Sequence, residues 1–227
     1  MDSFYGGFLM KEYMRRIMAM EQILVQLRET VCMEMLHGVE VSNLAVMLAR
    51  ELGEPEEFCR RIEVAGILHD IGKLRLTKYL YAEDGLVIEQ MKYVRQHTVH
   101  SRDMMLAAGY DDELAQIIYH HHENVDGSGY PDNLRGDRIP WMSRILRVCD
   151  VFIALTTDRS YRRAFDPKSA LEIMIDEVGD YDMRVFLAFQ RVIHRENFED
   201  GIEKIKEVRS DRQLEALQLF EMALKQI

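Results

Sequence analysis

The sequence predicts an all-α protein, a helical bundle with helical extensions at both ends, and three observations carry that prediction. Apolar residues recur at spacings of three and four almost throughout the 227 residues, which is the pattern of helices that bury one face. No stretch of useful length alternates apolar and polar residues as a half-buried strand does. Only 4 prolines and 13 glycines are present, which are too few for a turn-rich β-sandwich.

A long helical region is predicted first. Residues 8–52 form one or two long helices. Within residues 13–31 the apolar positions alternate in spacings of four and three, which is typical of a seam between helices. The seam fits either a homodimer contact or packing on the chain's own domain. The seam residues are Tyr13, Ile17, Met20, Leu24, Leu27 and Val31. A second helix restarts at Pro55 with acidic residues in its first turn, and it should end near Gly72, which suits a left-handed turn.

Further helices are predicted on both sides of one long irregular segment. A loop around residues 82–85 precedes a helix that ends at Gly109. Asp111 or Asp112 then caps the helix that carries three consecutive histidines. Residues 124–139 are rich in Gly, Asp, Asn and Pro, and long loops of this kind are often functional.

The remaining helices resume at Pro140 and after Asp166-Pro167, because proline suits a first helical turn. The tail from Asn197 onward is charged and amphipathic. We therefore expect three parts: an N-terminal helical extension over 1–32, a main domain over 33–195 and a C-terminal helical extension over 196–227.

The composition indicates a soluble globular protein. Its net charge of −10 argues against a protein that wraps polymeric nucleic acid, and it requires local Lys and Arg for any anionic substrate. Cys32, Cys59 and Cys149 are odd in number and form no C-x-x-C pair, which favours reduced thiols. No signal segment and no run near transmembrane length is apparent. We expect a cytoplasmic protein without a membrane partner.

Seven inward side chains indicate a metal centre. On the helix after Asp112, the apolar stripe leads to two neighbouring histidines, and His37, His97 and Asp150 also fall on apolar faces. Alone, an inward histidine is usually a hydrogen-bonded core residue, and a His-Asp dyad can cap a helix. Together, buried imidazoles and carboxylates need partners that divalent metals supply. The candidate ligands are His37, His69, Asp70, His97, His121, His122 and Asp150. His100, His120 and His194 are interpreted as surface residues or as supports of the ligands.

Four spaced elements resemble the HD-GYP family of HD-domain metal-dependent phosphohydrolases. They cover His-Asp-Ile-Gly-Lys (69–73), His-His-Glu-Asn-Val-Asp-Gly-Ser-Gly-Tyr-Pro (121–131), Asp-Val-Phe-Ile-Ala-Leu-Thr (150–156) and Arg-Ser-Tyr-Arg (159–162). The similarity extends over about residues 33–193. It implies an all-α HD fold and a phosphodiesterase that cleaves cyclic di-GMP to linear pGpG or on to GMP, with two divalent metals, iron first and manganese as the alternative.

The resemblance also implies roles for individual residues. It assigns metal ligation to the same seven side chains, with Asp70 as a bridge and a metal-bridging hydroxide as the nucleophile. Lys73 would neutralise phosphate charge or assist the leaving oxygen, and Arg159 and Arg162 would contact phosphate or guanine. Gly129 would let the ligand approach the backbone. Tyr130 would hydrogen-bond a phosphate oxygen.

The chain departs from the family pattern at several positions. Thr98 stands where proline is usual, Ile153 where aspartate is common and Ser160 where proline is common, while Ala82–Gly85 brings negative charge to the expected substrate entrance. Met33 replaces the glutamate that recruits a third metal in some members. A thioether cannot offset a hard cation's charge, so we predict a dinuclear centre with Met33 packed beside it.

Three functions remain open from the sequence. The first is cyclic di-GMP hydrolysis, which we favour. The second is hydrolysis of another nucleotide by an HD-type enzyme, for example cyclic GMP-AMP or a nucleoside phosphate. The third is a non-catalytic cyclic dinucleotide receptor. A receptor would be expected to lose ligands, Lys73 or Tyr130, and this chain has them all.

Overall fold

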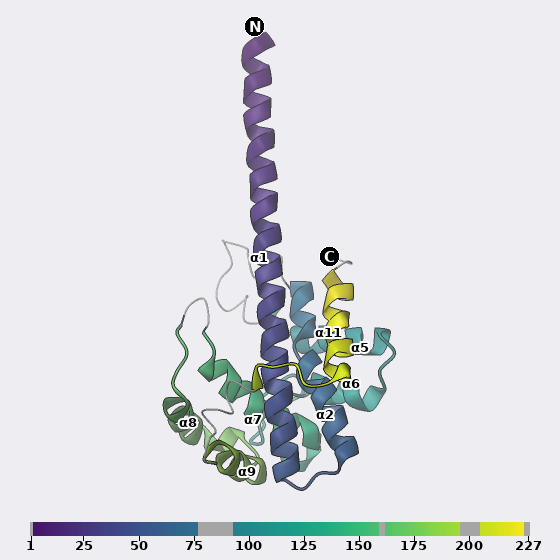
Figure 1. Cartoon of the computed structure of the whole chain (residues 1–227), viewed down its shortest axis with the longest axis vertical. Coiled ribbons are helices and arrows are strands. Elements are labelled where there is room, and N and C mark those ends of the chain that lie inside the picture. Colours follow the sequence, from purple (N-terminus) through teal and green to yellow (C-terminus); the bar gives the residue numbers. More distant parts are fainter. Residues whose placement is uncertain (1, 77–92, 159–161, 196–204, 225–227) are drawn as a thin grey trace. The chain divides into compact units, whose positions relative to one another are not determined.

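The computed structural model describes residues 2–76, 93–158, 162–195 and 205–224, and these form helices without a β-strand (Figure 1). The predicted all-α fold is confirmed. The chain divides into two compact units, Met1–Glu34 and Met35–Ile227. Helix α1 (Asp2–Glu51) is continuous through the boundary, so the predicted long N-terminal helical region is a single helix.

The second unit contains the rest of α1 and the other described helices. They are α2 (Glu56–Leu68), α5 (His97–Ala107), α6 (Asp112–Tyr119), α7 (Trp141–Thr156), α8 (Pro167–Asp176), α9 (Met183–Ile193) and α11 (Asp211–Leu224). Three short 3-10 helices complete it: η1 (Ile71–Leu76), η2 (Gly136–Arg138) and η3 (Val178–Asp180). The loop predicted around residues 82–85 lies outside the described residues.

Aspartate side chains begin three of these helices, as the cap rule expects. Asp111 accepts a hydrogen bond from the Leu114 N–H and begins α6, which decides between the two predicted caps. Asp166 and Asp182 accept backbone N–H bonds at the starts of α8 and α9 in the same way. Pro140 immediately precedes α7 as its cap residue, without a side-chain hydrogen bond.

The prediction that the second helix ends near Gly72 is wrong. Helix α2 ends at Leu68, and Gly72 lies within η1 and is not among the glycines with positive φ. A Cβ on Gly72 would clash with the carbonyl of His97 and the backbone nitrogen of Ser101. Glycine is therefore required here because η1 packs directly on the start of α5, and the Gly72 N–H donates to the Ser101 hydroxyl at 2.9 Å.

Two further glycines bring α1 and α2 into close contact within the second unit. A Cβ on Gly38 would lie 2.5 Å from the Ile67 carbonyl oxygen, and one on Gly66 would lie 2.5 Å from the Ser42 Cα. Because the two backbones approach so closely, the residues beside these glycines, His37 on α1 and His69 after α2, can share one centre.

The core of the second unit lies between α1, α2, α6, α7, α9 and α11. Its largest fully buried side chains include Leu44, Leu48, Ile62, Ile67, Leu68, Ile118, Phe152, Phe189 and Phe220. The tail is amphipathic, but α11 turns Ala216 and Phe220 toward the core and leaves Leu214 and Met222 exposed.

The N-terminal seam is mostly outside what the structure describes. The side chains at 13, 17, 20, 24 and 27 are not described, and Val31 is buried. The sequence was expected to contain no run near transmembrane length, but the helical segment Arg28–Glu51 is long and apolar enough to cross a membrane. Of that window, 61% is buried inside the protein, which core helices of soluble proteins also show.

Candidate metal centre

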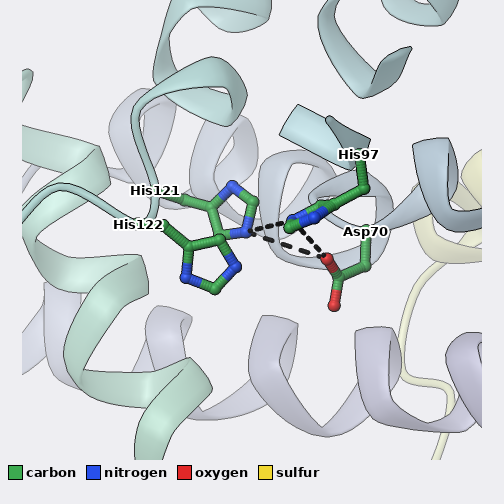
Figure 2. A group of neighbouring side chains, drawn as sticks. All are labelled: Asp70, His97, His121 and His122. Atoms are coloured by element: carbon green, nitrogen blue, oxygen red, sulfur yellow. Dashed lines mark hydrogen bonds and ion pairs between the residues drawn. The ribbon is translucent and has the colours of Figure 1, made fainter. Parts of the chain in front are cut away.

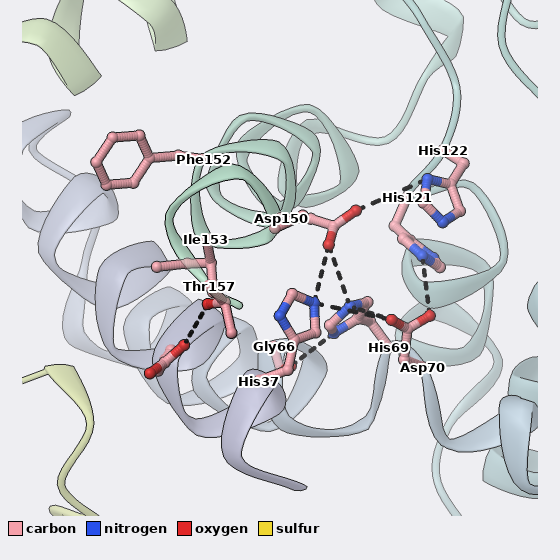
Figure 3. A network of polar contacts seen from close by, with 12 residues as sticks. His37, Gly66, His69, Asp70, His121, His122, Asp150, Phe152, Ile153 and Thr157 are labelled. Carbon is pink, nitrogen blue, oxygen red and sulfur yellow. Dashed lines mark hydrogen bonds and ion pairs between the residues drawn. The ribbon is translucent and has the colours of Figure 1, made fainter. Parts of the chain in front are cut away.

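Five segments of the second unit bring the seven candidate ligands together (Figure 2 and Figure 3). His37 comes from α1, His97 is the first residue of α5, and Asp150 lies in α7. The dyad His69-Asp70 follows the end of α2, and His121-His122 follow the end of α6. Six of the seven residues are buried and His122 is half-buried. Ligands spread over more than a hundred residues therefore converge on one place.

The donor atoms form two groups that could each hold a metal ion. The first group is Asp70, His97, His121 and His122, and the second is His37, His69, Asp70 and Asp150. Within each group, the ligand atoms all lie within 4.8 Å of one another. Asp70 belongs to both groups, so its two carboxylate oxygens are placed to join two adjacent cations.

Backbone carbonyls fix the tautomer of three of the histidines. The Nδ1 of His69 lies 2.8 Å from the Gly66 carbonyl oxygen, that of His97 lies 2.6 Å from Val94 O, and that of His121 lies 2.6 Å from Ile118 O. A carbonyl oxygen only accepts, so each Nδ1 carries its proton. In a neutral ring, Nε2 is then a lone-pair donor, which is the orientation found in metal-ligating histidines.

The first group places lone pairs against one another (Figure 2). The Nε2 atoms of His97 and His121 are 3.4 Å apart, and the His97 Nε2 is 3.1 Å from the Asp70 Oδ1. Three unprotonated acceptors at such distances repel unless a positive charge lies between them. A cation at this point resolves the repulsion, so the residues fit a metal ion.

The second group contains buried polar atoms without hydrogen-bond partners in the described part of the chain. They are His37 Nδ1, His69 Nε2 and Asp70 Oδ1. The His69 Nε2 nevertheless lies 3.0 Å from the Asp70 Oδ2, and the His37 Nε2 lies 3.0 Å from the Asp150 Oδ1. Buried polar atoms are rarely left unpaired, and metal coordination would satisfy the His69 Nε2 and the Asp70 Oδ1, which face the other donors.

The buried carboxylates and imidazoles of the centre shift one another's pKa values, and the two carboxylates favour a positive charge beside them. Burial alone would raise the pKa of Asp70, but His69 and Lys73 hold it well below its usual value. Burial alone would lower the pKa of His69, but the carboxylates of Asp70 and Asp150 raise it to about 10. Burial and the neighbouring His69 lower the pKa of His121 to about 3. A proton on His69 or a cation between the ligands can supply the charge.

Comparison with known proteins identifies the family of this chain. The HD-domain family matches residues 12–185. This chain is an HD-domain protein. Its His-Asp dyad and its Gly-Tyr-Pro element place it in the HD-GYP subgroup, as the motifs predicted.

The curated relatives are named as phosphodiesterases of two different cyclic dinucleotides. The chain is 34% identical over 160 residues to a cyclic di-GMP phosphodiesterase of Pseudomonas aeruginosa, covering 70% of this chain and 39% of that protein. It is 35% identical over 153 residues to 3'3'-cGAMP-specific phosphodiesterase 1 of Vibrio cholerae, covering 66% of this chain and 36% of that protein. The chain thus spans well under half the length of these relatives.

A solved structure shows the same fold. The crystal structure of a cyclic GMP-AMP-specific phosphodiesterase of Vibrio cholerae matches with a TM-score of 0.60 and 15% sequence identity. The match covers 83% of this HD-GYP chain and 55% of that chain.

Lys73 and Tyr130 of this HD-GYP chain lie beside the candidate ligands. The Lys73 Nζ is 2.6 Å from the Asp70 Oδ2. The Tyr130 ring stacks on His122 with 4.7 Å between centroids and meets His97 edge-on at 6.4 Å. Burial raises the pKa of Tyr130, so its hydroxyl stays protonated and can donate to an anion.

Gly129 is needed for the folding of its own loop. A Cβ at this position would clash with the Asn124 backbone nitrogen and would lie 2.5 Å from the His122 carbonyl oxygen. The loop therefore folds back on the histidines through Gly129, and the Tyr130 N–H donates to His122 O at 3.1 Å. The structure thus shows a close approach of Gly129 to the protein's own backbone, and the approach of a ligand to Gly129 stays a prediction.

The two arginines expected to contact substrate are not both described. Arg159 lies outside the described residues. The guanidinium of Arg162 donates to the carbonyls of Ala154 and Leu155 at 2.8 and 3.0 Å, at the end of α7, and stacks over Phe165. The substrate contact of either arginine stays a prediction.

The helix that was expected to carry the histidines ends before them. Helix α6 stops at Tyr119, and His120 is its cap residue, so His121 and His122 leave from a turn rather than from a continuing helical stripe. His120 was interpreted as a surface or supporting residue. It is buried, and its Nε2 pairs with Asp132 at 3.0 Å.

Sequence reasoning missed two residues near the centre. Glu123 is buried, and its carboxylate accepts the N–H groups of Asp132 at 2.7 Å and Leu134 at 3.0 Å, which closes the glycine-rich loop. Arg95 lies over the Tyr130 ring at 4.9 Å. The one sequence signal for Glu123 is its position inside the 121–131 element that resembles the family.

Proposed function

We propose that this chain is a metal-dependent phosphodiesterase that hydrolyses cyclic di-GMP to linear pGpG or on to GMP. The observation that carries the proposal is the pair of donor groups that share Asp70, with a lysine and a tyrosine beside them. A dinuclear centre of this kind suits in-line attack on a phosphodiester. The name of the Pseudomonas aeruginosa relative supports the choice of cyclic di-GMP.

The donor set of imidazoles and carboxylates suits iron, manganese or zinc, and the absence of thiolates among the seven residues disfavours a closed structural zinc. The resemblance to the HD-GYP family favours iron first and manganese second. When bound, two such ions supply water activation and stabilise charge on the phosphate oxygens. The seven residues predicted from the sequence would hold them. Lys73 would neutralise phosphate charge near Asp70, and the Tyr130 hydroxyl would donate to a phosphate oxygen.

A panel of cyclic dinucleotides tests the proposal. Protein loaded anaerobically with Fe²⁺ or with Mn²⁺ is incubated with cyclic di-GMP, cyclic GMP-AMP and cyclic di-AMP, and the products are resolved by chromatography. We expect pGpG from cyclic di-GMP, and no turnover by metal-stripped protein or by Asp70→Ala. Undiminished turnover in Asp70→Ala would overturn the proposed centre.

A second candidate function is hydrolysis of cyclic GMP-AMP. It is favoured by the relative named as 3'3'-cGAMP-specific, which is as similar to this chain as the cyclic di-GMP enzyme is. Faster turnover of cyclic GMP-AMP in the same panel would select it. Tight binding of a cyclic dinucleotide without cleavage under any metal would instead select the receptor function.

The cellular setting is also a proposal. We place the protein in the cytoplasm, acting on a soluble nucleotide without a membrane or polymeric nucleic acid partner. Residues 13–31 are proposed to form a homodimer contact, because their apolar positions follow a heptad-like pattern. Light scattering at micromolar concentration should give twice the 26.7 kDa chain mass, and a monomer mass would remove the dimer.

A further inference from the structure

A cyclic dinucleotide presents two phosphodiesters, but a single dinuclear centre acts on one of them. The second phosphate needs its own cation, since the chain carries a net charge of −10. Three other cations that the structure describes have contacts within the protein. Lys73 pairs with Asp70, the Arg147 Nε donates to Asn124 at 2.9 Å, and Arg162 donates to the end of α7.

Arg95 has the position and the chemistry for this task. Its guanidinium carbon lies 4.9 Å from the centroid of the Tyr130 ring, and that ring stacks on the candidate ligand His122. Among the described residues, its side chain has no hydrogen bond or ion pair. Exposure increases outward from the centre: His97 is buried, Tyr130 is half-buried and Arg95 is exposed. The guanidinium therefore lies at the exposed edge of the centre, and the Tyr130 ring separates it from the candidate ligand His122.

The backbone around Arg95 is tied to the centre. The Val94 carbonyl accepts from His97 Nδ1 at 2.6 Å, and the Arg95 carbonyl accepts from the Thr98 hydroxyl at 3.1 Å. Thr98 supplies this bond through its hydroxyl, which is a hydrogen-bond donor. The turn that contains Arg95 is thus held by hydrogen bonds to the ligand His97 and to its neighbour Thr98.

We propose that Arg95 binds the phosphate of the cyclic dinucleotide that is not being cleaved. The planar guanidinium matches two phosphate oxygens, and its stacking on Tyr130 keeps its N–H edge free to face the ligand. Arg95 is then a substrate-binding residue and takes no part in bond cleavage. This inference rests on the proposed function and names a second point of contact for the same substrate.

Two substrates separate binding from catalysis. Cyclic di-GMP has a second phosphate for Arg95, whereas bis(p-nitrophenyl) phosphate has one phosphodiester only. In Arg95→Gln we expect KM for cyclic di-GMP to rise about tenfold with kcat within about twofold, because a charge-assisted hydrogen bond is lost. Turnover of bis(p-nitrophenyl) phosphate should not change. Arg95→Lys should fall between, since it keeps the charge and loses the fork.

Arg184→Gln is the matched control, because Arg184 is also exposed and lies 4.6 Å over an aromatic ring, that of Trp141. It should match the wild type on both substrates. Unchanged KM for cyclic di-GMP in Arg95→Gln would overturn the inference. Equal losses on both substrates would also overturn it, since they would show that Arg95 only supports Tyr130.

Failure of the proposed function is recognised separately. If wild-type protein cleaves bis(p-nitrophenyl) phosphate and no cyclic dinucleotide, the proposed function is wrong. The role of Arg95 in phosphate binding is then tested by equilibrium dialysis of cyclic di-GMP with the metal-free protein. Binding that weakens about tenfold in Arg95→Gln supports the inference. Binding that is absent or unchanged overturns it.

Discussion

Asp70 is the residue on which the two donor groups depend. Its Oδ1 is 3.1 Å from His97 in one group, and its Oδ2 is 3.0 Å from His69 in the other. Carbonyl oxygens hold these two imidazoles with their Nε2 atoms turned inward. Loss of one imidazole should therefore affect one group, whereas loss of the carboxylate should affect both.

We predict a graded loss of metal. Wild-type protein should bind two metal ions per chain, His69→Ala and His97→Ala about one each, and Asp70→Ala none that survives dialysis. Elemental analysis after dialysis measures the ratio. His100→Ala is the control, since this half-buried histidine belongs to neither group, and it should keep two ions. Three ions in the wild type would contradict the dinuclear centre predicted from Met33, which lies in the first unit and is 46% exposed.

The geometry of the loop depends on the absence of a Cβ at Gly129. We predict that Gly129→Ala lowers the free energy of unfolding by about 2 kcal/mol and abolishes activity, because the added methyl group overlaps the backbone of residues 122–124. Gly179→Ala should change stability by less than about 0.5 kcal/mol, since open space surrounds its Cβ position. Urea unfolding checks both variants, and equal stability of the two would refute this account of Gly129.

At the scale of the elements, one ion pair joins the two helices that lead into the centre. Arg61 on α2 donates through both terminal nitrogens to the carboxylate of Asp111 at 2.9 Å, and Asp111 also caps α6. Helix α2 ends at Leu68, just before His69, and α6 ends at Tyr119, so this pair joins the middle of α2 to the start of α6, away from the ligands. It fixes the start of α6 relative to α2.

This pair makes stability depend on pH. Hydrogen bonds from Arg61 and from the Leu114 N–H lower the pKa of Asp111 from 3.8 to about 2. The unfolded chain therefore binds the proton first, and the stability from this carboxylate is complete above about pH 4 and is lost as pH falls toward 2. Asp111→Asn keeps the cap but loses the ionic contact, and it should cost about 0.5 kcal/mol at pH 7 because the carboxylate is half exposed.

Urea unfolding of wild type and Asp111→Asn between pH 7 and pH 3 measures this difference. It should shrink below pH 4, because the wild type then loses the ionic contribution as well. Asp112→Asn, at an exposed position in the same first turn, is the control and should follow the wild type at every pH. A difference that grows on acidification would have the wrong sign for the proposed linkage.

At the scale of the second unit, the C-terminal helix is held to the N-terminal part of the core by buried polar groups. Asn43 donates to the carbonyls of Ile205 and Glu207, both at 2.8 Å. Gln213 on α11 donates to the Ser42 hydroxyl at 3.1 Å and to the side-chain amide oxygen Oδ1 of Asn43 at 3.0 Å. Residues 205–224 are thereby part of the folded unit that contains the centre.

Gln213→Leu should lower the free energy of unfolding by about 2 kcal/mol, because it removes the donor to a buried amide oxygen. Gln218→Leu, on the exposed side of the same helix, should change it by less than about 0.5 kcal/mol. Chemical denaturation of the two variants provides the comparison. If both behave alike, the buried polar contacts do not attach α11.

The sequence by itself determined the all-α class, the helix start at Asp111 or Asp112, the helix start after Asp166-Pro167, and the family. These follow from spacing and from short motifs, which are local properties of the chain. The convergence of the seven candidate ligands also agrees with their positions on apolar faces, because burial is periodic along a helix.

Only the tertiary structure decided the features that depend on contacts between distant segments. Gly72 was expected to end a helix and instead lets η1 touch α5, and Gly129 lets the loop touch the backbone beside His122. Arg95 meets Tyr130 across 35 positions of sequence, in a contact that no local pattern encodes. The physical reason is that spacing reports which face of an element is buried, whereas packing decides which other element that face meets.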